Sequence, residues 1–180
     1  MKATGIVRRI DDLGRVVIPK EIRRTMRIRE GDPLEIYTDI DGEVIFKKYS
    51  PMGELAEFTA QYCEVLYKAI GMPVVITDRD HVVCCMGVQK KDAIDKRITS
   101  ALEKVMENRA GFIASAEDKN VLCPVDGLDR NACIAIPILG NGDVSGCVVV
   151  LFNEKNEIPA QAEIKLAEVA AQFLGRQTEE

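Results

Sequence analysis

Positively charged side chains are concentrated at the start of the chain. Nine of the first 29 residues are Lys or Arg and three are acidic, although the whole chain has a formal net charge of −5. If residues 20–27 form a helix, successive side chains are rotated by about 100° around its axis. Four basic side chains then lie within an arc of about 100°. A helix that is cationic on one side is typical of a surface that meets phosphate groups. The four side chains are Lys20, Arg23, Arg24 and Arg27.

Three further arginines flank residues 11–14, which have the composition of a turn. Arginine suits a nucleic-acid surface because its planar fork can hold phosphate oxygens or guanine edges with two hydrogen bonds. The alternative is an ordinary solvated surface, whose charges pair with Asp11, Asp12, Glu21 and Glu30. The candidate DNA-binding residues are Arg8, Arg9, Arg15, Arg23 and Arg24.

The sequence does not indicate an enzyme. It has no glycine-rich loop with a phosphate-binding lysine and no G-x-S-x-G motif, and its single histidine, His81, argues against a catalytic triad. The six cysteines form no C-x-x-C pair, which argues against zinc. Cys84 and Cys85 could sense oxidants, but neighbours on a strand face opposite sides, which favours their interpretation as small apolar residues. We expect no cofactor and no metal.

The two parts of the chain differ in charge. Residues 1–50 carry 11 basic and 9 acidic side chains, whereas residues 51–180 carry 13 and 20. With four Tyr, five Phe and no Trp, the chain offers few stacking platforms for single strands, so double-stranded DNA is the better partner. We see no signal peptide and no apolar run long enough for a membrane span, and we expect a cytoplasmic protein without a membrane partner.

Residues 1–50 read as short strands and one helix. We expect strands at 4–10 and 15–18, with Pro19 as the first residue of a helix that ends near Arg27. Alternation at 34–38 and 43–48, with Asp41–Gly42 between them, predicts a hairpin. Fifty residues arranged in this way bury little apolar surface and leave strand edges open. Both problems disappear if two copies interleave their strands, so we predict an obligate dimer.

Ser50 and Pro51 mark the start of a second domain, as N-cap and first residue of a helix. We expect domains at 1–50 and 56–180, joined by a short junction at 51–55. The apolar spacing predicts an antiparallel sheet flanked by helices, an α+β fold. The expected helices are 54–70, 92–109 and 160–176, and the expected strands are 73–77, 82–87, 121–125, 132–139 and 144–152, with a hairpin at 140–143.

Four segments of residues 1–50 carry a long, specific pattern: Gly5–Arg9, Asp12–Pro19, Arg23–Thr25 and Leu34–Tyr37. In this pattern the chain resembles the swapped-hairpin DNA-binding domain of the AbrB transition-state regulator family. The resemblance implies an intertwined dimeric β-barrel with one short helix per chain. It also implies binding to AT-rich, deformable DNA through shape rather than a base code. The family's DNA-contacting arginines match Arg8, Arg15, Arg23 and Arg24, and Arg9 fills a further basic position.

The order of elements in the second domain resembles a GAF-type sensory domain. Over its full length the chain resembles a family of regulators of late sporulation genes in spore-forming bacteria, with matches at Asp78–Asp80, Lys90–Asp92 and Asn141–Asp143. The resemblance implies an activator and repressor that forms a homodimer through the first domain and a homotetramer through the second. The signature of cyclic-nucleotide binding is not recognisable, so any small-molecule effector is unidentified.

Two other functions are compatible with the sequence. Some antitoxins share the swapped-hairpin domain, but they follow it with a short disordered tail, whereas here a compact apolar domain follows. The second domain could instead be a metabolite sensor whose ligand gates DNA binding, with the junction transmitting the signal as a tilt of the first domain. It could also serve only to assemble the tetramer.

Overall fold

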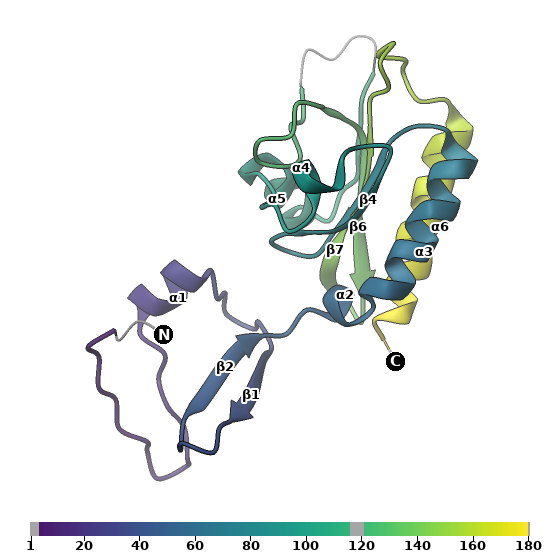
Figure 1. The fold of residues 1–180 in the computed structure, drawn as a ribbon. Coiled ribbons are helices and arrows are strands. Elements are labelled where there is room, and N and C mark those ends of the chain that lie inside the picture. Colours follow the sequence, from purple (N-terminus) through teal and green to yellow (C-terminus); the bar gives the residue numbers. More distant parts are fainter. Residues whose placement is uncertain (1–3, 116–120, 180) are drawn as a thin grey trace. The chain divides into compact units, whose positions relative to one another are not determined.

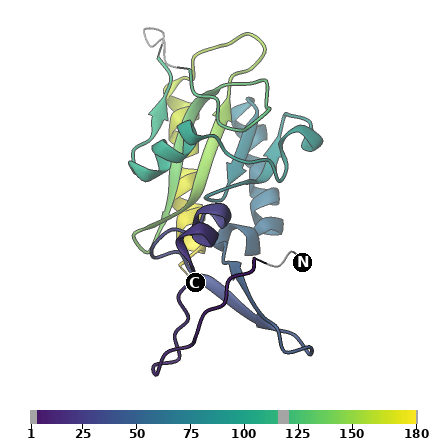
Figure 2. The same ribbon diagram turned by 90° about the vertical axis from the view of Figure 1, so that its left-hand side faces the viewer.

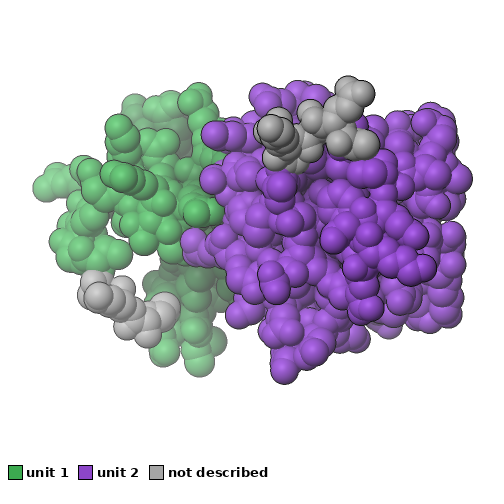
Figure 3. Space-filling view, turned by 90° about the horizontal axis from the view of Figure 1, so that it is seen from above, with its two compact units in different colours: residues 1–49 green, residues 50–180 purple. Residues whose placement is uncertain are grey.

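The computed structural model describes residues 4–115 and 121–179. It contains two compact units, unit 1 (residues 1–49) and unit 2 (residues 50–180), which Figure 3 shows in different colours. Each unit is described by itself below.

Unit 1 consists of one helix and one hairpin. Helix α1 covers Lys20–Met26, and the antiparallel strands are β1 (Leu34–Thr38) and β2 (Val44–Lys48) (Figure 1). The predicted hairpin is confirmed, and Gly42 provides the positive φ of 80° that its turn requires. Pro19 precedes α1 as its N-cap, because its ψ of 148° is extended, and not as the first helical residue that we expected.

The strands expected at 4–10 and 15–18 are not formed within one chain. Among residues 4–33, α1 is the only helix or strand. Asp11 N donates a hydrogen bond of 3.0 Å to Arg15 O, as at the end of a hairpin, but no ladder of bonds follows among the described residues. The physical reason is that a β-strand needs a neighbour to pair with its backbone groups, and these segments have none within their own chain.

Unit 2 begins at the predicted N-cap. The Ser50 hydroxyl accepts a hydrogen bond from Gly53 N (3.1 Å), Pro51 is the first residue of α2, and the hydroxyl donates to Asp78 Oδ2 (3.0 Å). The elements of unit 2 are α2 (Pro51–Glu54), α3 (Ala56–Ile70), β3 (Val74–Thr77), β4 (Val82–Met86), α4 (Lys90–Ala93), α5 (Ser100–Glu107), β5 (Phe112–Ile113), β6 (Ala132–Gly140), β7 (Asp143–Leu151) and α6 (Gln161–Gln177).

The five strands form one antiparallel sheet in the order β4-β3-β7-β6-β5. Strands β6 and β7 are nine residues each and form its centre with β3. The predicted hairpin between β6 and β7 is confirmed: Gly140 pairs with Asp143, and Asn141 and Gly142 have φ values of 50° and 82°. Two successive positive φ angles match the right-handed twist of the flanking strands.

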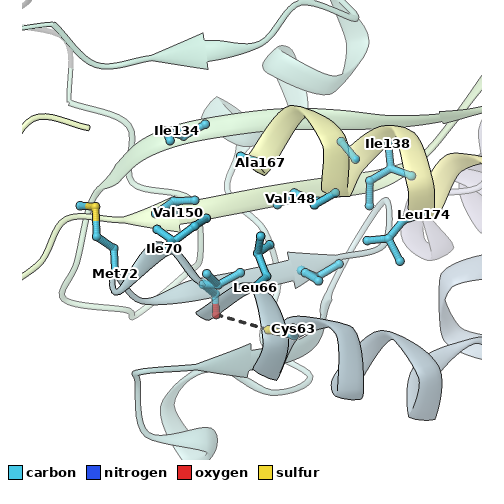
Figure 4. Packing of buried hydrophobic residues seen from close by; sticks show 14 of the residues in the cluster. Cys63, Leu66, Ile70, Met72, Ile134, Ile138, Val148, Val150, Ala167 and Leu174 are labelled. Atoms are coloured by element: carbon cyan, nitrogen blue, oxygen red, sulfur yellow. Dashed lines mark hydrogen bonds between the residues drawn. The ribbon is translucent and has the colours of Figure 1, made fainter. Parts of the chain in front are cut away.

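Helices cover both faces of this sheet. Helices α3 and α6 pack on one face, and α4 and α5 lie on the other (Figures 1 and 2). The core on the first face joins Leu66 of α3, Leu174 of α6 and Val148 of β7, as Figure 4 shows. The second core contains Leu102 of α5, Val125 and Val149. Since alternate residues of each strand enter different cores, unit 2 has the buried surface that unit 1 lacks.

Two sequence predictions for unit 2 are wrong. The helix expected at 92–109 is split into α4 and α5, because Asp95 has φ of 60° and Thr99 caps α5 by accepting a hydrogen bond from Leu102 N. The strand expected at 121–125 makes only isolated bridges, from Leu122 to Ala132 and from Val125 to Ile98. Instead, Phe112 and Ile113 form the edge strand β5 beside β6.

Helix α6 approaches β6 closely at Gly175. A Cβ atom at this position would overlap the backbone carbonyl of Leu139. We therefore expect Gly175→Ala to lower the free energy of unfolding of unit 2 by about 3 kcal/mol, since neither backbone can move without disturbing the core. Gln172→Ala, at an exposed position of the same helix, is the control and should leave it nearly unchanged. Chemical denaturation of both variants would measure the difference, and equal stabilities would contradict this packing.

Candidate nucleic-acid interface

All five candidate arginines lie in unit 1 and are exposed. Arg8 and Arg9 precede the loop of residues 11–15, Arg15 ends it, and Arg23 and Arg24 lie in α1. No hydrogen bond or ion pair among the described residues joins the arginines of the loop to those of the helix. One chain therefore presents two separate groups of guanidinium groups.

Asp11 organises the loop of residues 11–15. Its carboxylate accepts hydrogen bonds from Leu13 N (3.1 Å), Arg15 N (2.8 Å) and Arg15 Nε (2.8 Å). The carbonyl of Asp11 accepts a further bond from Gly14 N, and Gly14 has φ of 75°. One acidic side chain thus fixes both the backbone of the loop and the direction of the Arg15 guanidinium.

Hydrogen bonds from Arg15 lower the pKa of Asp11, the backbone N–H having the largest effect and the side chain the next. Bonds that favour the ionised form have this effect, and they stabilise the folded loop above the ordinary pKa of Asp. This stabilisation is lost as the pH falls through the lowered pKa. At neutral pH the loop is held in place.

The other four candidate arginines have no side-chain partner in the part of the chain that the structure describes. The alternative of a surface of paired charges is thus seen only at Asp11 and Arg15, a pair that is itself exposed. Exposed pairs contribute little to stability, so Arg15 can exchange its partner for a phosphate group at small cost. Arg8, Arg9, Arg23 and Arg24 are available to an anion without breaking any bond.

Helix α1 ends in a left-handed residue. Arg27 has φ of 51°, Arg27 N donates to Arg24 O (3.3 Å), and Ile28 N donates to Arg23 O (2.8 Å). These two bonds close the helix in a Schellman motif with arginine where glycine is usual. The backbone of Arg23 and Arg24 is thereby tied to the turn that follows the helix.

In the described part of unit 1 the apolar side chains are exposed or half-buried, apart from the buried Pro19. Among residues 4–49 none belongs to the buried hydrophobic core, and Val7, Val17 and Ile36 are 90%, 70% and 61% exposed. Ordinary soluble domains do not leave so much of their apolar surface in water. The arginines therefore stand beside a large apolar surface that a single chain does not cover.

Unit 2 offers little chemistry of its own. The described residues contain no group of three or more His, Cys, Asp or Glu side chains that could hold a metal ion. Cys84 enters the core beneath α3 and α6 and Cys85 the opposite core, which confirms that the pair faces opposite sides. Burial raises the pKa of Cys133 to about 12 and also raises the pKa of Cys147, so both thiols are protonated and unreactive at neutral pH.

Unit 2 also has open clefts, of which two have the size of a small-molecule site. One, of about 390 Å³, is lined by residues 87–89, Asp92 and residues 127–130. The other, of about 430 Å³, is lined by residues 70–72, Asn153, residues 157–160 and Glu163. Both are within the range of size that small-molecule sites have.

Comparison with known proteins decides the family. The family model of the stage V sporulation protein T C-terminal, a transcription factor, matches residues 54–179. Stage V sporulation protein T of Bacillus subtilis is 51% identical over 182 residues, which cover 100% of both chains. The chain belongs to the stage V sporulation protein T family. As a member of this family of sporulation transcription factors it is a regulator that acts on DNA, and not an enzyme.

The N-terminal segment has relatives of its own. The transition state regulatory protein AbrB of Bacillus subtilis is 65% identical over 51 residues, 28% of this chain and 52% of AbrB. A family model of the antidote-toxin recognition protein MazE, a bacterial antitoxin, matches residues 7–53. The identity to AbrB confirms the AbrB-type fold that we expected for the N-terminal domain of this chain.

The second domain of this family member has the GAF fold. A GAF domain of an Acinetobacter phosphoenolpyruvate-protein phosphotransferase superposes with a TM-score of 0.57, at 13% identity, over 73% of this chain and 84% of that one. This likeness concerns the fold alone. No helix in residues 4–115 or 121–179 is long and apolar enough to cross a membrane.

Sequence reasoning missed Asp11 as the residue that organises the loop. The signal was present, because an Asp two residues before a Leu-Gly pair favours a turn in which its side chain accepts backbone N–H groups. It also missed the residues that hold the end of α1, since these lie 16 positions apart in the chain, at Asp32 and Lys48.

We expect Arg15→Ala to raise the pKa of Asp11, because the variant loses the Nε hydrogen bond. The backbone N–H of residue 15 remains, so the pKa should still lie below its ordinary value of 3.8. NMR titration of the Asp11 carboxyl carbon would measure both. Arg9→Ala removes the same charge without touching Asp11 and is the control; equal titration curves in the two variants would refute the role of Arg15.

Proposed function

We propose that the chain binds double-stranded DNA through Arg8, Arg9, Arg15, Arg23 and Arg24 of unit 1. The observation that carries this proposal is a set of four exposed arginines without a side-chain partner among the described residues, of which Arg8 and Arg9 precede the loop that Asp11 organises and the other two lie on α1. In a transcription factor, such groups are the natural contacts for phosphate, and their forks can also reach base edges. Phosphate contacts would supply most of the affinity, at many sequences alike.

The proposed binding form is a dimer of unit 1. A second copy of the same segment is the partner best suited to the exposed apolar side chains, because pairing the segments 4–10 and 15–18 between chains would satisfy their backbone groups. It would also double the number of guanidinium groups and relate them by a two-fold axis. This is the swapped-hairpin barrel that the AbrB resemblance implies.

The proposed mode of recognition is shape readout of AT-rich, deformable DNA. Sequence-dependent bending energy can then select sites that the protein contacts only through the backbone. We propose late sporulation genes as its targets, with activation at some promoters and repression at others, in the cytoplasm. Membership of a family of sporulation transcription factors supports this proposal.

Unit 2 is proposed to assemble two dimers into a tetramer. Its helices α3 and α6 keep apolar side chains on the side away from the sheet: Val65 is 63% exposed, Val169 54% and Phe173 39%. The Phe173 ring stacks on Tyr62 with centroids 5.3 Å apart, which gives this surface a rigid aromatic centre. We call these exposed apolar side chains of α3 and α6 the apolar stripe. The other exposed side chains of the two helices are mostly polar or charged, so the apolar stripe is the part that favours association with a second copy.

The proposed domains are residues 1–50 and 56–180, joined by the junction 51–55. The antitoxin alternative is not favoured, because unit 2 has its own core on both faces of a sheet and is not a disordered tail. An effector remains part of the proposal only as an unidentified small molecule, for which the 390 Å³ and 430 Å³ clefts have room.

Replacing Arg23 and Arg24 together with Ala should weaken DNA binding on the order of a hundredfold, at AT-rich and other duplexes alike. The fold should persist, because both side chains are exposed and unpaired. Fluorescence anisotropy with labelled duplexes would measure the affinity. The control is Lys90→Ala with Lys91→Ala in α4, which removes the same charge from unit 2 and should leave affinity unchanged.

The salt dependence of binding tests the number of phosphate contacts. If four arginines of each chain contact phosphate, log K should fall against log salt with a slope of about −7 for the dimer. The Arg23/Arg24 double variant should reduce this slope to about −4, since four of eight contacts are lost. A wild-type slope near zero would refute the electrostatic basis of the proposal.

Val169→Glu should convert the tetramer into dimers, because it places a charge in the apolar stripe of α6. Sedimentation velocity would show the change as a halving of the mass. Gln161→Glu adds the same charge at an exposed position two turns away on the same helix and should leave the mass unchanged. Dissociation by both variants, or by neither, would contradict the proposed surface.

A further inference from the structure

The turn that joins α1 to the hairpin of unit 1 is held by a buried ion pair. Asp32 has a side chain that is 3% exposed, and its Oδ2 atom lies 3.8 Å from Lys48 Nζ, whose side chain is 25% exposed. The same oxygen accepts a hydrogen bond from Arg29 N (2.8 Å). A carboxylate so far removed from water requires such partners, since burial of an unpaired charge is costly.

Lys48 connects this carboxylate to the end of α1. Its ammonium donates a hydrogen bond of 3.0 Å to Arg27 O, across 21 positions of the chain. Arg27 is the left-handed residue that ends the helix, and the next residue, Ile28, donates its N–H to Arg23 O. The contacts therefore run without a gap from strand β2, through Lys48 and the turn, to the backbone of Arg23.

We propose that Asp32 and Lys48 are positioning residues that set the direction of α1, and with it the presentation of Arg23 and Arg24 to DNA. This inference rests on the proposed role of the two arginines. We call the two residues, with their bonds to Arg27 and Arg29, the Asp32–Lys48 clamp. Neither residue needs to contact DNA for the clamp to act.

Helix α1 needs such a clamp for a physical reason. It has seven residues, no side-chain N-cap and no buried side chain, and so neither propensity nor packing fixes it within one chain. A contact between an arginine and DNA depends on the direction of the helix. Because the side chain is long, a small tilt of α1 moves its guanidinium group by a large distance. Fixing the last turn by Lys48 of the hairpin and Asp32 of the connecting turn supplies the order that the helix lacks.

The sign of one substitution separates the clamp from simple electrostatics. Asp32→Asn keeps the shape of the side chain and removes a negative charge from a unit that binds a polyanion, so electrostatics alone predicts tighter DNA binding. The clamp predicts weaker binding, on the order of tenfold, because Lys48 loses a charged partner and the turn is held less firmly. Glu30→Gln, at an exposed position of the same turn, is the matched control and should not weaken binding.

A double-mutant cycle separates positioning from a general loss of structure. Affinity of the full chain for one AT-rich duplex is measured for Asp32→Asn, for Arg23→Ala with Arg24→Ala, and for all three together. If the clamp acts through the arginines, Asp32→Asn should have no further effect once they are gone. Lys48→Met should weaken binding as Asp32→Asn does, and Lys48→Arg, which keeps a donor for Arg27 O, should restore most of the affinity.

The outcomes distinguish the clamp from the proposed function. If the arginine variant binds as tightly as the wild type, the proposed function is wrong. If the arginine variant loses affinity but Asp32→Asn behaves like Glu30→Gln, or costs the same with and without the arginines, the clamp is refuted. A thermal unfolding curve for each variant confirms that the affinity is measured on folded protein.

Discussion

Unit 1 is shaped by a shortage of burial. Its forty-odd described residues carry many apolar side chains, yet none reaches a buried core within one chain. Local order therefore comes from polar bonds: Asp11 holds one loop, and Asp32 with Lys48 holds the turn after α1. Arg15 and the end of α1 are therefore held by polar bonds and not by packing.

Unit 2 solves the opposite problem. Its sheet is covered on both faces and its long central hairpin is almost wholly buried. Unit 2 therefore buries enough apolar surface to be stable by itself, whereas unit 1 does not. The two units thus divide the work. One provides a stable body with an apolar stripe for association, and the other provides guanidinium groups on short, polar-bonded segments. In the function that we propose, the DNA-binding form arises only through assembly.

Sequence reasoning succeeded where the signal is local. The Asp41–Gly42 and Asn141–Gly142 turns, the Ser50 cap and the apolar strands β6 and β7 each follow from neighbouring residues, and the structure has them as expected. It failed at 92–109, where apolar spacing fitted a helix but Asp95 takes a left-handed conformation. The candidate arginines were predicted from the distribution of charge, whereas the pairing of Asp32 with Lys48 depends on the fold of the hairpin and leaves no pattern in the sequence.

The junction at Ser50 has a consequence for how the protein is arranged on a chromosome. Strand β2 ends at Lys48 and α2 starts at Pro51, whose cap is bonded to Asp78. The two residues between them can span at most about 7 Å, which is too short for a flexible linker. In the assembly that we propose, this short junction would limit how far apart two N-terminal domains can move. The spacing of paired operator sites, and not their composition alone, would then affect binding.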